Sequence, residues 1–198
     1  MMAARAKLKA SRSKPGGIYV ALLRGINVGG KNKLPMADLS AIFVKVGCAD
    51  VRTYIQSGNV VFRAKSANVS KLAGKIEDGI EEQFGFRPQV VVRSEAELRK
   101  VIEENPFASR DLPPNQLLVL FFAGEASKQA IADALLVNKG LEEIQATGQE
   151  LYVYFPDGIG KSKLSIPAME RALKVSTTGR NWNTVTKLLE IAEEMTDG

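Results

Sequence analysis

The sequence predicts an α+β protein made of two tandem ferredoxin-like units, each with the element order β-α-β-β-α-β, with further helices appended. Three observations predict this fold. Apolar runs of strand length and apolar residues at helical spacing alternate in the same order in both halves of the chain, and a short glycine-containing turn marks a hairpin in each half. The 198 residues are 45% hydrophobic and 25% charged, a composition typical of globular proteins.

The first unit is predicted to cover residues 18–93. Its strands are short apolar runs, its helices repeat apolar residues three and four positions apart, and Ser57-Gly58 supplies a glycine for a tight turn. In chain order, the expected elements are a strand at 18–23, a helix from Pro35 to Gly47, a hairpin of 51–56 and 59–63, a helix at 69–84 and a strand at 89–93.

Residues 94–115 are predicted to connect the two units, and Ser94 with Glu97 forms a capping box that begins a helix there. The second unit and the C-terminal helix take residues 116–198. The expected elements of the second unit are a strand at 117–122, a helix from Ser127, a hairpin of 142–147 and 150–155, a helix at 166–173 and a short strand at 175–177. A last helix, at about 181–195, has one broad apolar face and is expected to pack on the body.

Residues 1–17 form a basic leader with five Lys or Arg residues and no acidic residue. We expect this leader to be disordered, and polyphosphate binding and targeting remain alternatives. It lacks the apolar core of a secretory signal. The remaining residues hold 22 basic and 22 acidic side chains, so the body is neutral.

Composition also excludes several kinds of chemistry. The chain has no histidine, which excludes His-based triads and His metal sites, and no other metal-ligand spacing occurs, so neither metal nor cofactor is predicted. Cys48 is the single cysteine and makes no internal disulfide, which favours a cytoplasmic location. No apolar stretch approaches the roughly 20 residues that a transmembrane helix needs. The oligomeric state stays open.

The glycine-rich segment 25–32 almost matches a phosphate-binding loop. Gly25, Gly30 and Lys31 have the required spacing, but Asn32 replaces the hydroxyl residue that would hold magnesium, and the helix begins late, at Pro35. Nucleotide hydrolysis is therefore disfavoured. Two interpretations remain open: an anion-binding loop assisted by nearby basic side chains, and a simple connection whose glycines adopt positive φ.

Three other segments contain candidate functional residues. Residues 158–163 form a lysine-rich glycine turn before a helix, which is either an anion site or a solvated loop. Residues 179–184 include Arg180. They are predicted to form either a helix N-cap above Trp182 or part of a functional site. Tyr19 lies where an RNA-recognition motif has a stacking aromatic, although a core position explains it equally well. Cys48 follows a helix C-terminus, where the dipole disfavours a thiolate.

Four separated motifs resemble one family of bacterial proteins. They are ALLRGINVGG at 21–30, YIQSGNV at 54–60, NPF at 105–107 and RNWNTV at 180–185. The family is known only as a domain of unknown function, and the resemblance covers about residues 18–195. It implies a compact α/β protein built from ferredoxin-like halves, and it carries over no activity or catalytic residue.

Our leading functional hypothesis is a binding protein whose polar cleft accepts an anionic or phosphate-bearing small molecule. The candidate residues are polar and lie in loops next to strands: Arg24, Asn27, Lys31, Lys33, Ser57, Asn59, Arg180 and Asn183. A single site requires that Arg24, Ser57 and Arg180 lie together rather than on separate faces.

Three alternatives belong to other functional classes. The first is an enzyme that acts on a small phosphorylated or carboxylated substrate, with Lys, Tyr, Asp or Glu as acid and base. The second is a nucleic-acid-binding protein that uses the leader and the basic segment 18–65, whose net charge is +5. The third is an interaction protein whose sheets pair in a dimer.

Overall fold

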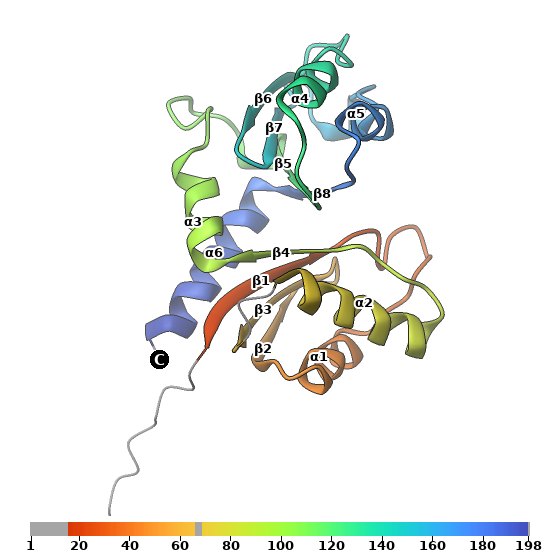
Figure 1. Cartoon of the computed structure of the whole chain (residues 1–198). Helices are drawn as coiled ribbons and strands as arrows, with labels where there is room; N and C mark the ends of the chain where they lie inside the picture. Colours follow the sequence, from red (N-terminus) through yellow and green to blue (C-terminus); the bar gives the residue numbers. More distant parts are fainter. Residues whose placement is uncertain (1–15, 66–68, 198) are drawn as a thin grey trace, which may run out of the picture.

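Two four-stranded antiparallel sheets form the centre of the molecule (Figure 1). The computed structural model describes residues 16–65 and 69–197, so most of the predicted leader lies outside the described residues. The first sheet has the strand order β2-β3-β1-β4 and the second has the order β6-β7-β5-β8. In both sheets, the first strand of the unit therefore lies between the third and the fourth.

Both units have the element order β-α-β-β-α-β. The first contains β1 (Gly17–Leu23), α1 (Met36–Lys45), β2 (Ala49–Tyr54), β3 (Asn59–Ala64), α2 (Val69–Phe84) and β4 (Val90–Ser94). The second contains β5 (Leu117–Phe122), α4 (Lys128–Leu135), β6 (Glu143–Thr147), β7 (Glu150–Tyr154), α5 (Ile166–Leu173) and β8 (Thr177–Asn181). Helix α3 (Glu95–Glu103) lies between the units, and α6 (Trp182–Asp197) follows them. The α+β class is confirmed.

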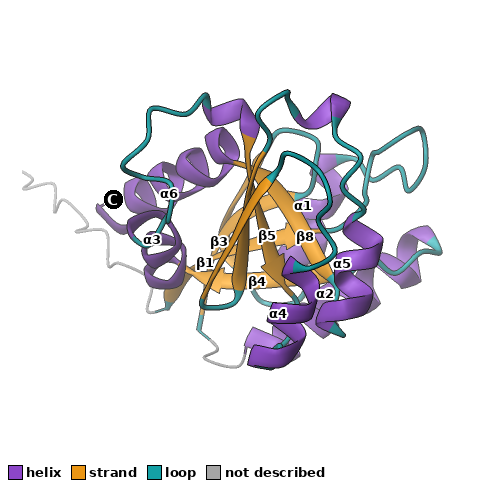
Figure 2. Ribbon diagram, turned by 90° about the horizontal axis from the view of Figure 1, so that it is seen from above, coloured by secondary structure: helices purple, strands orange, loops and turns teal. Residues whose placement is uncertain are grey.

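The sheets and helices form layers. Helices α1 and α2 cover the outer face of the first sheet, and α4 and α5 cover the outer face of the second, as Figure 1 shows. The inner faces of both sheets contribute to one shared core with α3 and α6, which lie together on one side of the strands in Figure 2. Because β1 is buried on both faces, its sequence is a continuous apolar run rather than an alternating one.

Helix α6 joins the two units, since it packs against β1 and β3 of the first and against β5 and β8 of the second. Its apolar face contributes five buried residues to the shared core: Val185, Leu188, Leu189, Ala192 and Met195. The expectation that the last helix packs on the body therefore agrees with the structure.

The position of the last strand is a correction. The sequence predicts it at 175–177, whereas β8 covers Thr177–Asn181. The difference arises because this edge strand has a glycine and a buried arginine where an apolar run would be recognisable. The predicted helix cap is nevertheless present, since the Asn181 side chain accepts a hydrogen bond from the Thr184 N–H at 2.9 Å.

The capping box at the start of α3 gives a test of local stability. The Ser94 hydroxyl accepts the Glu97 N–H, and the Glu97 carboxylate accepts the Ser94 N–H. We expect Ser94→Ala to lower the free energy of unfolding by about 1 kcal/mol in urea titrations. Ser40→Ala is the matched control, because Ser40 lies inside α1 and bonds only the Met36 carbonyl. Equal losses in both variants would contradict the capping role.

Candidate functional site

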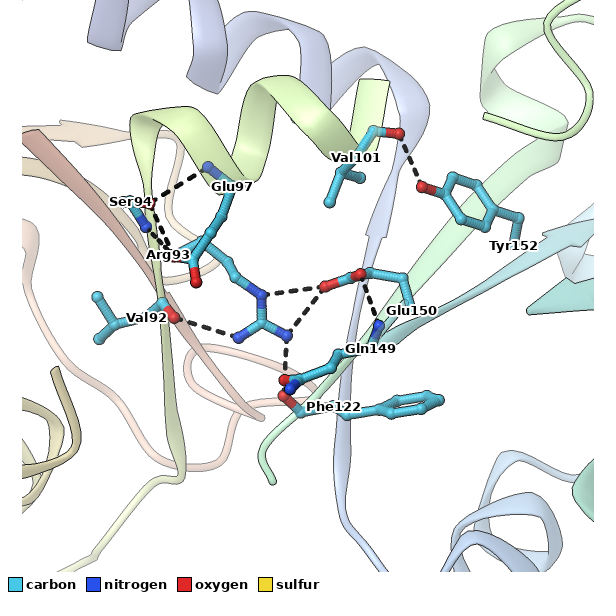
Figure 3. Close-up of polar contacts among 9 residues, drawn as sticks. All are labelled: Val92, Arg93, Ser94, Glu97, Val101, Phe122, Gln149, Glu150 and Tyr152. Atoms are coloured by element: carbon cyan, nitrogen blue, oxygen red, sulfur yellow. Dashed lines mark hydrogen bonds and ion pairs between the residues drawn. The ribbon is translucent and has the colours of Figure 1, made fainter. Parts of the chain in front are cut away.

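Arg93 on β4 reaches from the first sheet to the second (Figure 3). Its Nε donates to Glu150 Oε1 at 3.0 Å, and its Nη2 donates to the Phe122 carbonyl at 3.1 Å. The two charged side chains are only 10% and 9% exposed. Burial raises the pKa of Glu150 above its usual value, and the neighbouring guanidinium opposes that rise. A buried ion pair therefore joins the two sheets, and we call this contact the Arg93 clamp.

Arg180 on β8 reaches in the opposite direction, from the second sheet to the first. Its Nε donates to Asn59 Oδ1, and its Nη2 donates to the Leu23 carbonyl at 2.8 Å. The same Nη2 also donates to the carbonyls of Ser57 and Gly58 in the β2–β3 turn. Its Nη1 donates to Thr178 Oγ1 and to the Gly179 carbonyl. Arg180 is 7% exposed, and all of these acceptors are neutral. We call this contact the Arg180 clamp.

The two clamps are equivalent in position. Each arginine is the fourth residue of the last strand of its unit, and each donates to the side chain of the first residue of the other unit's third strand. Each also donates to the last carbonyl of the other unit's first strand. The chemical difference is that the side-chain acceptor is Glu150 in one clamp and Asn59 in the other. The charge of Arg180 therefore has no counter-ion in its clamp.

A cleft of about 420 Å³ opens beside Arg180, and we call it the Arg180 cleft. This volume lies in the range of small-molecule sites. Its walls come from β8 and β5, from the loop after β1, from the β2–β3 turn and from the first residues of α5 and α6. The lining residues are Leu23, Arg24, Gly25, Ile26, Val28, Ile55, Ser57, Leu118, Leu120, Ile166, Thr177, Thr178, Gly179, Arg180, Asn181 and Thr184.

The two arginines of this cleft differ in their charge balance. Arg24 is 41% exposed and forms an ion pair with Glu170 at 2.8 Å, so its charge is largely compensated. Glu170 also accepts the N–H and the hydroxyl of Thr177. Burial lowers the pKa of Arg180 to about 10, which still leaves this guanidinium protonated at neutral pH. Arg180 is thus a buried positive charge beside an open cleft.

Two hydroxyl groups of the cleft have protons to donate. Ser57 Oγ accepts a hydrogen bond from Asn59 at 2.9 Å, and Thr178 Oγ1 accepts one from Arg180 at 2.9 Å. A hydroxyl that accepts such a bond keeps its own proton for another acceptor. The Ser57 and Thr178 hydroxyls are therefore free to donate their protons to a ligand in the cleft, and an anionic ligand needs such hydrogen-bond donors.

The structure brings together some of the predicted site residues. Arg24, Ser57 and Arg180 line the same cleft, and Asn59 lies behind it as the acceptor of Arg180. Asn27 and Lys33 line a separate hollow of about 620 Å³ next to the start of α1. Lys31 is exposed and, like Asn183, is part of neither lining.

Asn27 has a structural role in its loop. Its side chain donates to the carbonyls of Leu34 and Gln56, both at 2.9 Å, and accepts the Leu34 N–H at 2.8 Å. Asn32 closes the same loop by donating to the Gly25 carbonyl. Helix α1 begins only at Met36, so the loop is not the phosphate-binding type in which a helix starts directly after the glycines.

Sequence reasoning missed several residues of the cleft. Ile55 was expected in a strand, but β2 ends at Tyr54 and Ile55 has φ of 48°, which is unusual for a β-branched residue. Thr178 and Gly179 were expected outside the strand that carries them. The one available signal in the sequence is that Ile55 stands directly before the polar turn string Gln56-Ser57-Gly58.

The other predicted sites find less structural support. Four basic residues of segment 18–65 are in ion pairs. They are Arg24 with Glu170, Lys45 with Glu82, Arg52 with Glu194 and Arg63 with Asp50. Tyr19 stacks on Phe62 with ring centroids 5.9 Å apart and packs against the outer core of the first sheet. Since helices and the shared core cover both faces of that sheet, it offers no open platform for stacking bases.

Residues 17–152 match a family model described as a protein of unknown function, DUF1697. The chain belongs to the DUF1697 family. The resemblance to a domain of unknown function is thereby confirmed. This DUF1697 protein is also similar to the solved structure of the conserved bacterial protein SP0830 from Streptococcus pneumoniae, with 27% sequence identity and a TM-score of 0.72. The match covers 89% of this chain and 98% of that one. No curated protein matches.

Among residues 16–65 and 69–197, no helix combines the length and the apolar character that crossing a membrane requires. The same part of the chain contains no group of three or more Cys, Asp or Glu side chains placed to hold a metal ion.

The two clamps allow a direct test of the buried ion pair. We expect Arg93→Met to lower the free energy of unfolding by about 3 kcal/mol, because it leaves the Glu150 carboxylate buried without its counter-ion. The double variant Arg93→Met, Glu150→Met should recover most of this loss. Arg52→Met is the control, since its ion pair with Glu194 is exposed and should contribute less than about 1 kcal/mol. A loss for Arg93→Met no larger than that of the control would contradict the clamp.

Cys48 gives a test of reactivity. Its side chain is buried, and this burial raises the pKa of the thiol to about 11. At pH 8 about one thiol in a thousand would be ionised. We expect native protein to react with an aromatic disulfide reagent orders of magnitude more slowly than protein unfolded in guanidinium. Equal rates in the two states would show that the thiol is accessible and ionised in the fold.

Proposed function

We propose that this DUF1697 protein binds a small anionic molecule in the Arg180 cleft. The observation that carries the proposal is the difference between the two clamps: Arg93 has a carboxylate partner, and Arg180, in the equivalent position, has an amide. Burying a charge costs free energy unless an opposite charge compensates it. A ligand carboxylate or phosphate in the cleft would supply the missing negative charge.

The groups around Arg180 suit such a ligand. The guanidinium N–H groups are already bonded to neutral acceptors, so Arg180 contributes its charge rather than a direct hydrogen bond. Direct donors come from the hydroxyls of Ser57 and Thr178 and from the N–H groups of Arg24 that do not bond Glu170. Charge-assisted bonds of this kind are stronger than neutral ones.

The same lining favours binding over catalysis. Among the described residues that line the cleft there is no Asp, Glu, Lys, Cys or Tyr to act as an acid, base or nucleophile. Glu170 is close, but Arg24 and Thr177 already occupy its oxygens. We therefore prefer a binding protein to an enzyme, and the ion pairs of the basic segment weaken the case for nucleic acid.

We further propose that the two units are ferredoxin-like and that they divide the chain at 18–93, 94–115 and 116–198. The repeated element order and the identical strand order of the two sheets support this description. The proposed bacterial origin rests on the family resemblance and on the bacterial neighbour. The proposed cytoplasmic location rests on the single cysteine, which makes no internal disulfide.

An internal carboxylate tests this function. Asn59→Asp would give Arg180 a carboxylate partner, as Glu150 is for Arg93. Because the charge of Arg180 would then be compensated within the protein, we expect this variant to bind phosphate and acetate about tenfold more weakly or worse. Binding would be measured from amide chemical shifts of the glycines that line the cleft. Arg24→Gln should weaken binding as well, because it removes an exposed charge from the same wall.

Lys31→Gln is the matched control, since it removes one positive charge outside the cleft. Asn59 also donates to Tyr54 and Ser57, so thermal unfolding of each variant is measured in parallel. Anion binding that Asn59→Asp leaves unchanged, or that Lys31→Gln weakens equally, would contradict the proposed site.

A further inference from the structure

Gly179 forms part of one wall of the Arg180 cleft. It lies in the middle of β8 and has no positive φ, so its backbone does not require glycine. A Cβ at this position would lie 3.2 Å from Leu120 Cδ2 and 3.4 Å from Leu118 Cδ1. The Leu118 and Leu120 side chains therefore occupy the place that a side chain here would take, and together with Gly179 they form part of the apolar wall of the cleft. Glycine inside a strand often marks the close approach of a ligand or another chain.

The first unit fills the equivalent position. Val92 on β4 pairs with Ala21 of β1 in the same register in which Gly179 pairs with Leu120 of β5. The Val92 side chain is buried and belongs to the outer core of the first sheet. The first unit thus has a β-branched side chain at this strand position, whereas in the second unit the side chains of Leu118 and Leu120 occupy the equivalent place.

Further apolar groups surround the opening. Val28 in the loop after β1 is 64% exposed, and Ile55 in the β2–β3 turn is 52% exposed. Both line the Arg180 cleft, together with Ile166 at the start of α5. Apolar side chains that cluster at the rim of a concave site, next to a few polar groups, are typical of small-molecule sites.

Building on the proposed function, we propose that the ligand is an amphiphilic anion: a carboxylate or phosphate monoester that carries a short apolar chain. The charged head would lie near Arg180 and the hydroxyls of Ser57 and Thr178. The chain would pass over Gly179 and contact Leu118 and Leu120. A bare inorganic anion would leave this apolar wall in contact with water, so it would use only the polar part of the cleft.

The experiment titrates acetate, butyrate, hexanoate and octanoate into the full chain and follows glycine amide shifts. We expect affinity to rise about threefold for each added methylene until the apolar wall is covered. Gly179→Val, whose side chain would displace Leu118 and Leu120 from this wall, should lose the dependence of affinity on chain length. Gly160→Val is the matched control, because that glycine lies outside the cleft, has no positive φ and has open space around it.

The outcomes separate this inference from the proposed function. Acetate and octanoate that bind equally well would overturn the inference and leave the anion site intact, whereas no binding by any of these anions would overturn both. A second measurement uses the unchanged protein and does not depend on any variant. Bound octanoate should show nuclear Overhauser effects from its chain to the methyl groups of Leu118 and Leu120. Saturable binding without these effects would place the chain elsewhere and overturn the inference.

Discussion

The structure depends on how two buried guanidinium groups find acceptors. The side chains of Arg93 and Arg180 each extend from their own sheet and donate hydrogen bonds to the other sheet. Each unit thus contains a buried guanidinium that depends on acceptors in the other unit. The acceptors are the ends of first strands and the starts of third strands. These contacts fix the loop after β1 and the β2–β3 turn relative to β8, and those segments form the walls of the Arg180 cleft.

The same geometry gives the two units opposite electrostatics. A cleft of about 430 Å³ lies beside β4, lined by Arg93 and by the loop after β5, in the position that the Arg180 cleft occupies beside β8. There the arginine is neutralised by Glu150, and Glu77 and Glu125 add negative charge. Both clamps hold the two sheets together. The Arg93 clamp contains a carboxylate and is electrically neutral, whereas the Arg180 clamp contains an amide and leaves a positive charge beside an open cleft.

Local signals in the sequence predict most elements and only part of the site. The run at β1, the Ser94 capping box and both hairpins are visible because neighbouring residues determine them. The pairing of Arg180 with Asn59 joins residues 121 positions apart, and no local pattern reports it. Asn27 illustrates the opposite error, because a polar loop residue that suggests ligand binding instead satisfies the backbone of its own loop.

Helix α6 has a consequence for the order of folding during synthesis. The inner face of the first sheet is completed by residues 182–197, which follow that sheet by about a hundred positions in the chain. As the chain leaves the ribosome, the first unit can form its outer core with α1 and α2, while its inner apolar face remains exposed to water. Contacts of such long sequence separation form slowly, and partly folded chains with exposed apolar faces tend to aggregate. Helix α6, which is made after both sheets, therefore converts two half-covered sheets into a single cooperative unit.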